Sequence, residues 1–85
     1  MSDLKAQFEQ AAQDVQKLAK KPNNETLLKL YSLYKQALVG DVSGPRPGAF
    51  DMVGAAKYQA WSKLKGMSKD KAMEGYVALV QSLLK

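Results

Sequence analysis

Apolar residues recur at helical spacing in four separate stretches of this 85-residue chain. Spacing of i, i+3, i+4 and i+7 places such side chains on one face of an α-helix, whereas a half-buried strand needs apolar and polar residues to alternate. No stretch alternates in that way, and no segment is repeated. The pattern therefore predicts one all-α domain over residues 1–85, a small bundle of four amphipathic helices.

Capping and breaking residues give the expected bounds of the first helix. It begins at Leu4, with Ser2 or Asp3 as the cap, and it ends near Lys20. Pro22 sets that end because a proline disfavours helical geometry in the residue before it.

The second helix is expected to begin at once, with Asn24 as N-cap, and to end at Gly40 in a left-handed conformation. Asp41 then opens a loop, residues 42–50, which holds two prolines and two glycines and is not expected to be regular structure. This proline- and glycine-rich loop separates the second helix from the third.

The third helix is expected from about Met52 to Leu64, closed by Gly66, with Ala56, Ala60 and Trp61 on its inner side. Ser68 is the expected cap of the fourth helix. The apolar stripe of that fourth helix is the most regular in the chain and consists of Ala72, Met73, Tyr76, Val77, Val80, Leu83 and Leu84.

Charge and composition limit the classes of function. Lysine and arginine outnumber aspartate and glutamate by 13 to 8, and the whole surplus lies beyond residue 20. Such a bias favours an anionic partner: nucleic acid, an acidic membrane surface or a phosphorylated small molecule. The chain lacks histidine and cysteine, and its eight carboxylates form no pair on an apolar helical face. We therefore expect no enzymatic activity, no catalytic residue, no metal and no cofactor.

The chain shows no apolar leader and no run approaching the ~18 apolar residues of a membrane span. The expected protein is cytoplasmic and monomeric, without stable membrane insertion.

Two residues of the second helix suggest a binding site. Tyr31 and Lys35 lie four residues apart, on nearly the same face, and Leu28 precedes Tyr31 by one turn. Lys57 and Tyr76 come from the inner edges of two other helices, so a bundle could bring all four polar side chains to one pocket. Tyrosine offers a stacking face and a hydroxyl, and lysine binds phosphate. Alternatively, each tyrosine is a core-boundary residue with a buried ring and a solvated hydroxyl.

Several short segments together resemble the acyl-CoA-binding proteins, in the order and spacing of that family and over essentially the whole chain. They are Tyr31-Ser-Leu-Tyr-Lys-Gln-Ala37, Gly40-Asp41, Arg46-Pro-Gly48, Asp51, Gly54, Ala56-Lys57, Ala60-Trp61, Leu64-Lys-Gly66, Ser68, Ala72-Met73 and Tyr76. The resemblance implies a four-helix, up-down-down-up bundle that binds, buffers and transports medium- to long-chain fatty acyl-CoA. It also allows transient contacts with enzymes that use this ligand.

The resemblance further assigns residues to parts of the ligand. It implies that Tyr31, Lys35, Lys57 and Tyr76 bind the coenzyme A head group, with Tyr31 and Lys35 at the adenine and the ribose 3'-phosphate. Tyr34, Ser32, Leu33, Gln16 and Val53 are added as secondary contacts. The acyl chain is expected in a groove lined by Leu27, Leu28, Phe8 and Ala12.

Some positions depart from the family pattern. Many members carry lysines where this chain has Gln16, Val53 and Ala55, and usually tryptophan where it has Tyr58. Each missing charge-assisted contact is expected to lower affinity by roughly 0.5 to 2 kcal/mol.

Two alternatives from other classes remain: a basic helical module for nucleic acid and a helical protein-interaction domain. The first is disfavoured because lysine and arginine are spread over three helices and a loop, with no basic stripe along one helix. We therefore expect no nucleic-acid partner.

Overall fold

Four α-helices account for most of residues 3–84, the part of the chain that the computed structural model describes. They are α1 (Leu4–Asp14), which continues into a 3-10 turn, η1 (Val15–Lys17), and then α2 (Asn24–Leu38), α3 (Met52–Ser62) and α4 (Lys69–Leu84). The described residues contain no strand. The all-α prediction is confirmed.

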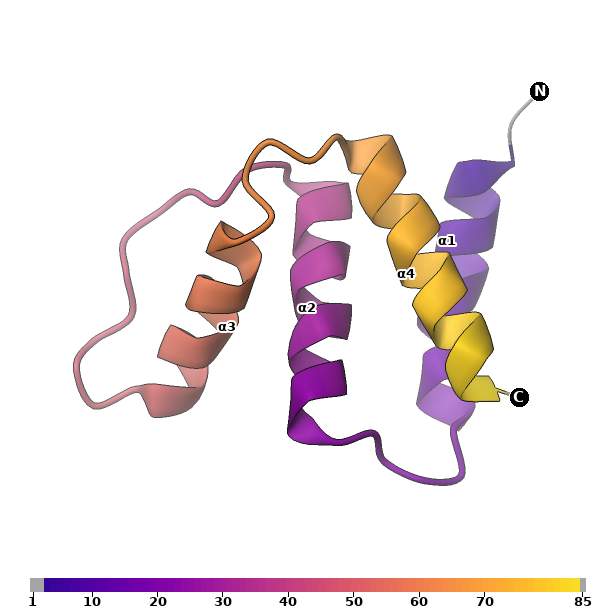
Figure 1. Cartoon of the computed structure of the whole chain (residues 1–85), viewed down its shortest axis with the longest axis horizontal. Helices are drawn as coiled ribbons and strands as arrows, with labels where there is room; N and C mark the ends of the chain where they lie inside the picture. The colour runs from indigo at the N-terminus through magenta and orange to yellow at the C-terminus, as the bar shows by residue number, and fades with distance from the viewer. Residues whose placement is uncertain (1–2, 85) are drawn as a thin grey trace.

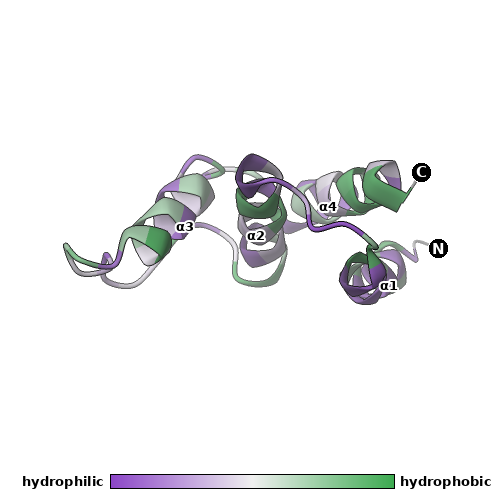
Figure 2. Cartoon of the chain, turned by 90° about the horizontal axis from the view of Figure 1, so that it is seen from below, coloured by the Kyte–Doolittle hydropathy of each residue, from purple (hydrophilic) through white to green (hydrophobic). Residues whose placement is uncertain are grey.

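The order of the helices in space follows from the long connection between α2 and α3. Residues 39–51 lead the chain back along the molecule, so that α2 and α3 run in the same direction while α1 and α4 run in the opposite one (Figure 1). This is the up-down-down-up arrangement. The helices form a flat slab of 40 × 31 × 15 Å, with α2 between α3 and α4 (Figure 2).

The buried core joins α1, α2 and α4. At its centre the ring of Phe8 contacts Tyr34 and Tyr76 at centroid distances of 5.4 and 5.1 Å. Val80 of α4 is fully buried beside them. Leu33 packs on α4 at Gly75, where a Cβ atom would lie only 3.2 Å from the leucine methyl group, so a glycine allows the two helices to approach closely.

Two helices end earlier than expected, one by six residues and the other by two. The first α-helix ends at Asp14 rather than near Lys20, because the chain tightens there into the 3-10 turn η1. Leu18 is then extended, and the residues that follow it connect to α2. The third ends at Ser62, two residues before Leu64, in a series of turns.

Two caps also differ from expectation. Asn23, not Asn24, caps α2, its side-chain oxygen accepting from Thr26 N at 2.8 Å. At α1, Asp3 makes no side-chain cap bond, and Ser2 lies outside the described residues. The expected cap of α4 is confirmed, since Lys71 N donates to Ser68 Oγ. Gly40 has the expected left-handed conformation, with φ of 94°.

A polar cluster ties the end of α2 to the turn before α4. The amide nitrogen of the fully buried Gln36 donates to Asp41 Oδ1 at 3.0 Å and to the Met67 carbonyl at 2.8 Å. The same Asp41 oxygen accepts from Gly66 N at 2.8 Å. These bonds lower the pKa of Asp41, the backbone bond from Gly66 most and the Gln36 bond next.

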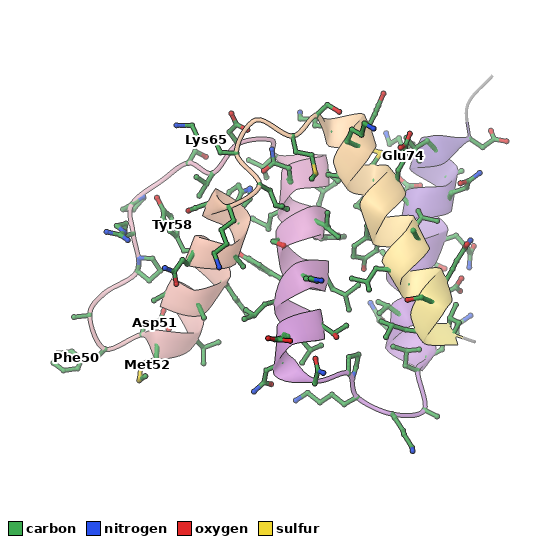
Figure 3. All side chains as sticks on the ribbon, in the orientation of Figure 1. Phe50, Asp51, Met52, Tyr58, Lys65 and Glu74 are labelled. Atoms are coloured by element: carbon green, nitrogen blue, oxygen red, sulfur yellow. The ribbon has the colours of Figure 1, made fainter. Side chains whose placement is uncertain are left out.

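Asp41 therefore makes the free energy of unfolding depend on pH. Because its pKa is lower in the folded protein, its contribution is complete above the ordinary carboxyl value of 3.8 and is lost as pH falls through the folded pKa. We expect Asp41→Asn to lower the urea unfolding midpoint at about pH 7 and to lower it less at about pH 3. The control is Glu74→Gln, on the exposed side of α4 (Figure 3). Its effect on the urea unfolding midpoint should not become smaller between about pH 7 and about pH 3. An Asp41→Asn deficit of equal size at both pH values would contradict the assignment.

A side chain of α3 holds the loop that precedes this helix. Tyr58 donates its hydroxyl to the Gly44 carbonyl at 3.2 Å, so the tyrosine that replaces the usual tryptophan faces the loop (Figure 3). Asp51 caps α3 by accepting from Gly54 N at 2.8 Å. A Cβ atom at Gly54 would collide with that carboxylate, which explains the glycine.

Over residues 3–84, no helix combines the length and apolar character that crossing a membrane requires.

Candidate ligand-binding site

A cavity of about 490 Å³ opens between the first turns of α2 and α3. Its size falls in the range of small-molecule sites, roughly 300–1,000 Å³. Because α2 and α3 run in the same direction, their N-terminal halves face each other there. The lining is largely apolar, with a lysine at each side, and consists of Lys21, Asn24, Leu27, Leu28, Met52, Val53, Ala56 and Lys57.

Two lysines lie on aromatic faces between α2 and α3, and one of them, Lys57, also lines this cavity. Lys57 Nζ of α3 lies 5.3 Å from the ring centroid of Tyr31 on α2, and Lys35 Nζ of α2 lies 5.1 Å from that of Trp61 on α3. Each pair crosses between the helices, and such cation–π contacts contribute about 0.5 to 2 kcal/mol. Trp61 itself is buried and donates its indole N–H to the Gly40 carbonyl at 2.9 Å.

Neither of these lysines has a carboxylate partner among residues 3–84. Their charges therefore remain available to an anionic ligand. Along α2, Leu28, Tyr31 and Lys35 follow one another at successive turns, and seven residues of helix span about 10.5 Å. The surface that α2 turns toward α3 thus changes over that distance from apolar, through aromatic, to cationic.

A second, smaller cavity of about 230 Å³ lies on the other side of Tyr31, among α1, α2 and α4. Tyr76 contributes to its wall although only 4% of that residue is exposed. Burial, and next the neighbouring Tyr34, raise the pKa of Tyr76 above its ordinary value. No hydrogen bond joins the Tyr76 hydroxyl to another described residue. The lining consists of Ala12, Val15, Gln16, Leu30, Tyr31, Tyr34 and Tyr76.

The model of the family described as acyl CoA binding protein matches residues 5–80 of this chain. This chain belongs to the acyl-CoA-binding protein family. Among curated relatives, it is 51% identical over 81 residues to the acyl-CoA-binding protein of Brassica napus, covering 95% of this chain and 88% of that one. It is also 49% identical over 77 residues to acyl-CoA-binding protein homolog 1 of Caenorhabditis elegans, covering 91% and 90%.

Solved structures of the family have the same fold. The crystal structure of Oryza sativa acyl-CoA-binding protein 2 matches with a TM-score of 0.90 at 42% identity, over 95% of this chain and 90% of that one. The solution structure of the yeast acyl coenzyme A binding protein matches with a TM-score of 0.74 at 47% identity, over 91% and 90%.

Most of the ligand contacts predicted from the family resemblance line one of the two cavities or lie between α2 and α3. Tyr31, Lys35 and Lys57 lie together between α2 and α3, and Tyr76 adjoins them across Tyr31 in the smaller cavity. The secondary contacts Val53 and Gln16 line the larger and the smaller cavity respectively, and Tyr34 lines the smaller one.

Other predicted contacts lie elsewhere. Ser32 and Leu33 line neither cavity: the buried Ser32 donates its hydroxyl to the Lys29 carbonyl at 3.0 Å, and Leu33 packs on α4. The predicted acyl groove is divided as well. Leu27 and Leu28 line the larger cavity, whereas Ala12 lines the smaller one and Phe8 is buried in the core.

The larger cavity has four lining residues that were not among the predicted contacts: Met52, Ala56, Lys21 and Asn24. Met52 and Ala56 lie four residues apart at the start of α3, and Ala56 directly precedes Lys57. Their spacing indicates that they share a face of the helix, so they could have been predicted as contacts. Lys21 and Asn24 belong to the connection into α2, where periodicity gives no direction. No cluster of potential metal ligands occurs among residues 3–84.

Proposed function

We propose that this protein is a non-catalytic carrier that binds medium- to long-chain fatty acyl-CoA thioesters, buffers their free concentration and transports them within the cytoplasm as a monomer. Transient contacts with acyl-CoA-using enzymes belong to the same proposal. The observation that carries it is the change from apolar to cationic lining between α2 and α3, from Leu27 and Leu28 to Lys57 and Lys35. Membership of the family supports the choice of ligand.

The chemistry of the ligand matches the apolar and the cationic end of the surface between α2 and α3. Coenzyme A carries about four negative charges at pH 7, which the unpaired lysines would attract. Burying a C16 chain removes up to about fifteen methylenes from water, at ~0.8 kcal/mol each, or ~12 kcal/mol before ordering costs. Chain length should therefore dominate affinity, while Tyr31 and the lysines select the head group.

The departures from the family pattern do not all bear on this site. Val53 and Gln16 line the cavities, so a lysine at either position would reach the ligand. Ala55 instead faces the loop side of α3 together with Arg46 and Tyr58. We therefore attribute a loss of affinity to Val53 and Gln16 and none to Ala55.

Calorimetric titration with palmitoyl-CoA, free coenzyme A and palmitate tests the proposal directly. We expect palmitoyl-CoA to bind most tightly by a wide margin, because it alone can contact both the apolar and the cationic part of the surface between α2 and α3. Equal binding of all three ligands, or binding of none, would refute the assignment. The nucleic-acid and protein-interaction alternatives gain no support from the comparisons, and no basic stripe runs along any of the described helices.

Lys35→Ala is expected to weaken palmitoyl-CoA binding by more than tenfold. A hydrogen bond to a charged group contributes about 1.5–3 kcal/mol, and tenfold corresponds to about 1.4 kcal/mol. The measurement is the calorimetric dissociation constant, with helix content checked by circular dichroism. Lys29→Ala is the matched control: it removes the same charge from an exposed position on α2 that lines neither cavity. Equal losses in both variants would indicate a general charge effect rather than a specific contact.

Tyr76→Phe separates the packing role of Tyr76 from its hydroxyl. The ring stays in the aromatic cluster with Phe8 and Tyr34, so the unfolding midpoint should hardly change. The hydroxyl makes no bond to the described residues, and its loss should weaken ligand binding about two- to tenfold, the effect of one neutral hydrogen bond. Unchanged affinity would exclude this hydroxyl from the ligand contacts.

A further inference from the structure

Three apolar side chains are strongly exposed where the loop enters α3. Phe50 is 99% exposed, Met52 80% and Val53 67%, and we call these residues the apolar corner. Phe50 and Met52 project away from the body of the molecule at its outer end (Figure 3). The loop and the first turn of α3 form an apolar tip at one end of the slab (Figure 2). At this exposure the Phe50 side chain buries almost no apolar surface within the fold.

The apolar corner is continuous with the larger cavity. Met52 and Val53 belong both to the corner and to the cavity wall, whereas Phe50 does not line the cavity. A partner that covers the corner would therefore also cover part of the wall of the cavity. A lipid chain could pass between that partner and the cavity without crossing open water.

Positive charge flanks the apolar corner on both sides of α3. Lys21 and Lys57 line the cavity together with Met52 and Val53, and Arg46 lies on the loop side of α3 with Ala55 and Tyr58. None of these three cations is paired with a carboxylate in the part of the chain that the structure describes. Asp51 is the one acid between residues 46 and 57, and its carboxylate caps α3. An apolar tip flanked by cations matches the interface of a bilayer that contains anionic lipid.

The size of the corner favours a bilayer over a second copy of the chain. The corner consists of three side chains, whereas a standard protein interface draws on roughly 20–30 residues a side. A bilayer needs no complementary surface and accepts a few inserted side chains.

From these features we infer that the apolar corner is a peripheral docking site for an anionic lipid surface, with Phe50 inserted at the level of the headgroups and the cavity entrance facing the lipid. The inference rests on the proposed function, because it gives the acyl chain a direct route between bilayer and cavity. It adds a partner to that function, a membrane surface containing acidic phospholipid. It requires no membrane-spanning segment.

Flotation with sealed vesicles tests the inference on the full chain. We expect the protein to bind vesicles of equimolar phosphatidylcholine and phosphatidylserine, and to bind pure phosphatidylcholine vesicles at least about fivefold more weakly. Phe50→Ser should reduce binding to the mixed vesicles at least about fivefold. Val39→Ser is the matched control, since Val39 is a 47% exposed apolar residue at the end of α2 that lines neither cavity. This control should bind like the unaltered protein.

Two further measurements separate the alternatives. Phe50→Ser should keep the solution affinity for palmitoyl-CoA within about twofold, because Phe50 lies outside the cavity. Vesicle binding that does not depend on Phe50, or that Val39→Ser weakens equally, would overturn the inference. So would a dimer by light scattering that Phe50→Ser dissociates, since a second copy would then cover the corner. Phe50-dependent vesicle binding without palmitoyl-CoA binding would instead refute the proposed function and leave the docking site.

Discussion

Tyr31→Ala is expected to weaken palmitoyl-CoA binding by more than tenfold without unfolding the bundle. Tyr31 lines the smaller cavity, and its ring carries the ammonium group of Lys57, which lines the larger one. Alanine would remove the aromatic face that we assign to the adenine, and stacking of a base on such a face contributes about 1–3 kcal/mol. It would also leave Lys57 without the ring that positions it. Calorimetric titration gives the dissociation constant.

Tyr31→Phe is the matched control for this prediction. It keeps the ring and the cation–π contact and removes only the hydroxyl, so its loss of affinity should be much smaller than that of Tyr31→Ala. Similar losses in the two variants would assign the effect to the hydroxyl. Unchanged affinity in Tyr31→Ala would exclude Tyr31 from the site.

Phe8→Ala is expected to lower the free energy of unfolding by about 3–5 kcal/mol. Phe8 is almost fully buried, and its ring contacts both Tyr34 and Tyr76 where α1, α2 and α4 meet. For a domain whose total stability is about 5–15 kcal/mol, such a loss is severe. Urea unfolding followed by far-UV circular dichroism measures it.

The chain supplies its own control for Phe8→Ala. Phe50→Ala deletes the same side chain from a position that is fully exposed, and its effect on the free energy of unfolding should stay within about 0.5 kcal/mol. If Phe8 lined a ligand groove instead of the core, Phe8→Ala would weaken binding while leaving the unfolding curve in place. The two readouts therefore distinguish the predicted groove role of Phe8 from the packing seen in the structure.

The helices were predictable because their apolar stripes extend over several turns. The apolar stripe of α4 predicts the buried face of that helix correctly, since Tyr76, Val77 and Val80 are buried. Helix ends were less predictable, because they depend on single residues. Asn23 and Asn24 are equally good caps by residue type, and only the backbone turn after Pro22 decides that Asn23 accepts the bond from Thr26.

The site was predictable along α2 and less so between helices. The four-residue spacing of Tyr31 and Lys35 shows that they share a face, but periodicity does not show that Lys57 reaches Tyr31 and that Lys35 reaches Trp61. Those contacts depend on α3 lying parallel to α2, which the long loop makes possible. Phe8 could not be assigned from its spacing, because an apolar residue on an inner face lines a groove or fills a core equally well.

The attachment of α3 has a consequence for local stability. Among the described helices, α3 packs only on α2, and Trp61, its one buried residue, stands apart from the core formed by α1, α2 and α4. Elements with few buried contacts open at lower free energy than the rest of a fold. Amide hydrogens of α3 should therefore exchange with solvent by a sub-global opening that leaves α1, α2 and α4 protected. In that partly open state the wall formed by Leu27 and Leu28 stays in place while the wall formed by Met52 and Ala56 moves away, so the cavity opens by the undocking of a single helix.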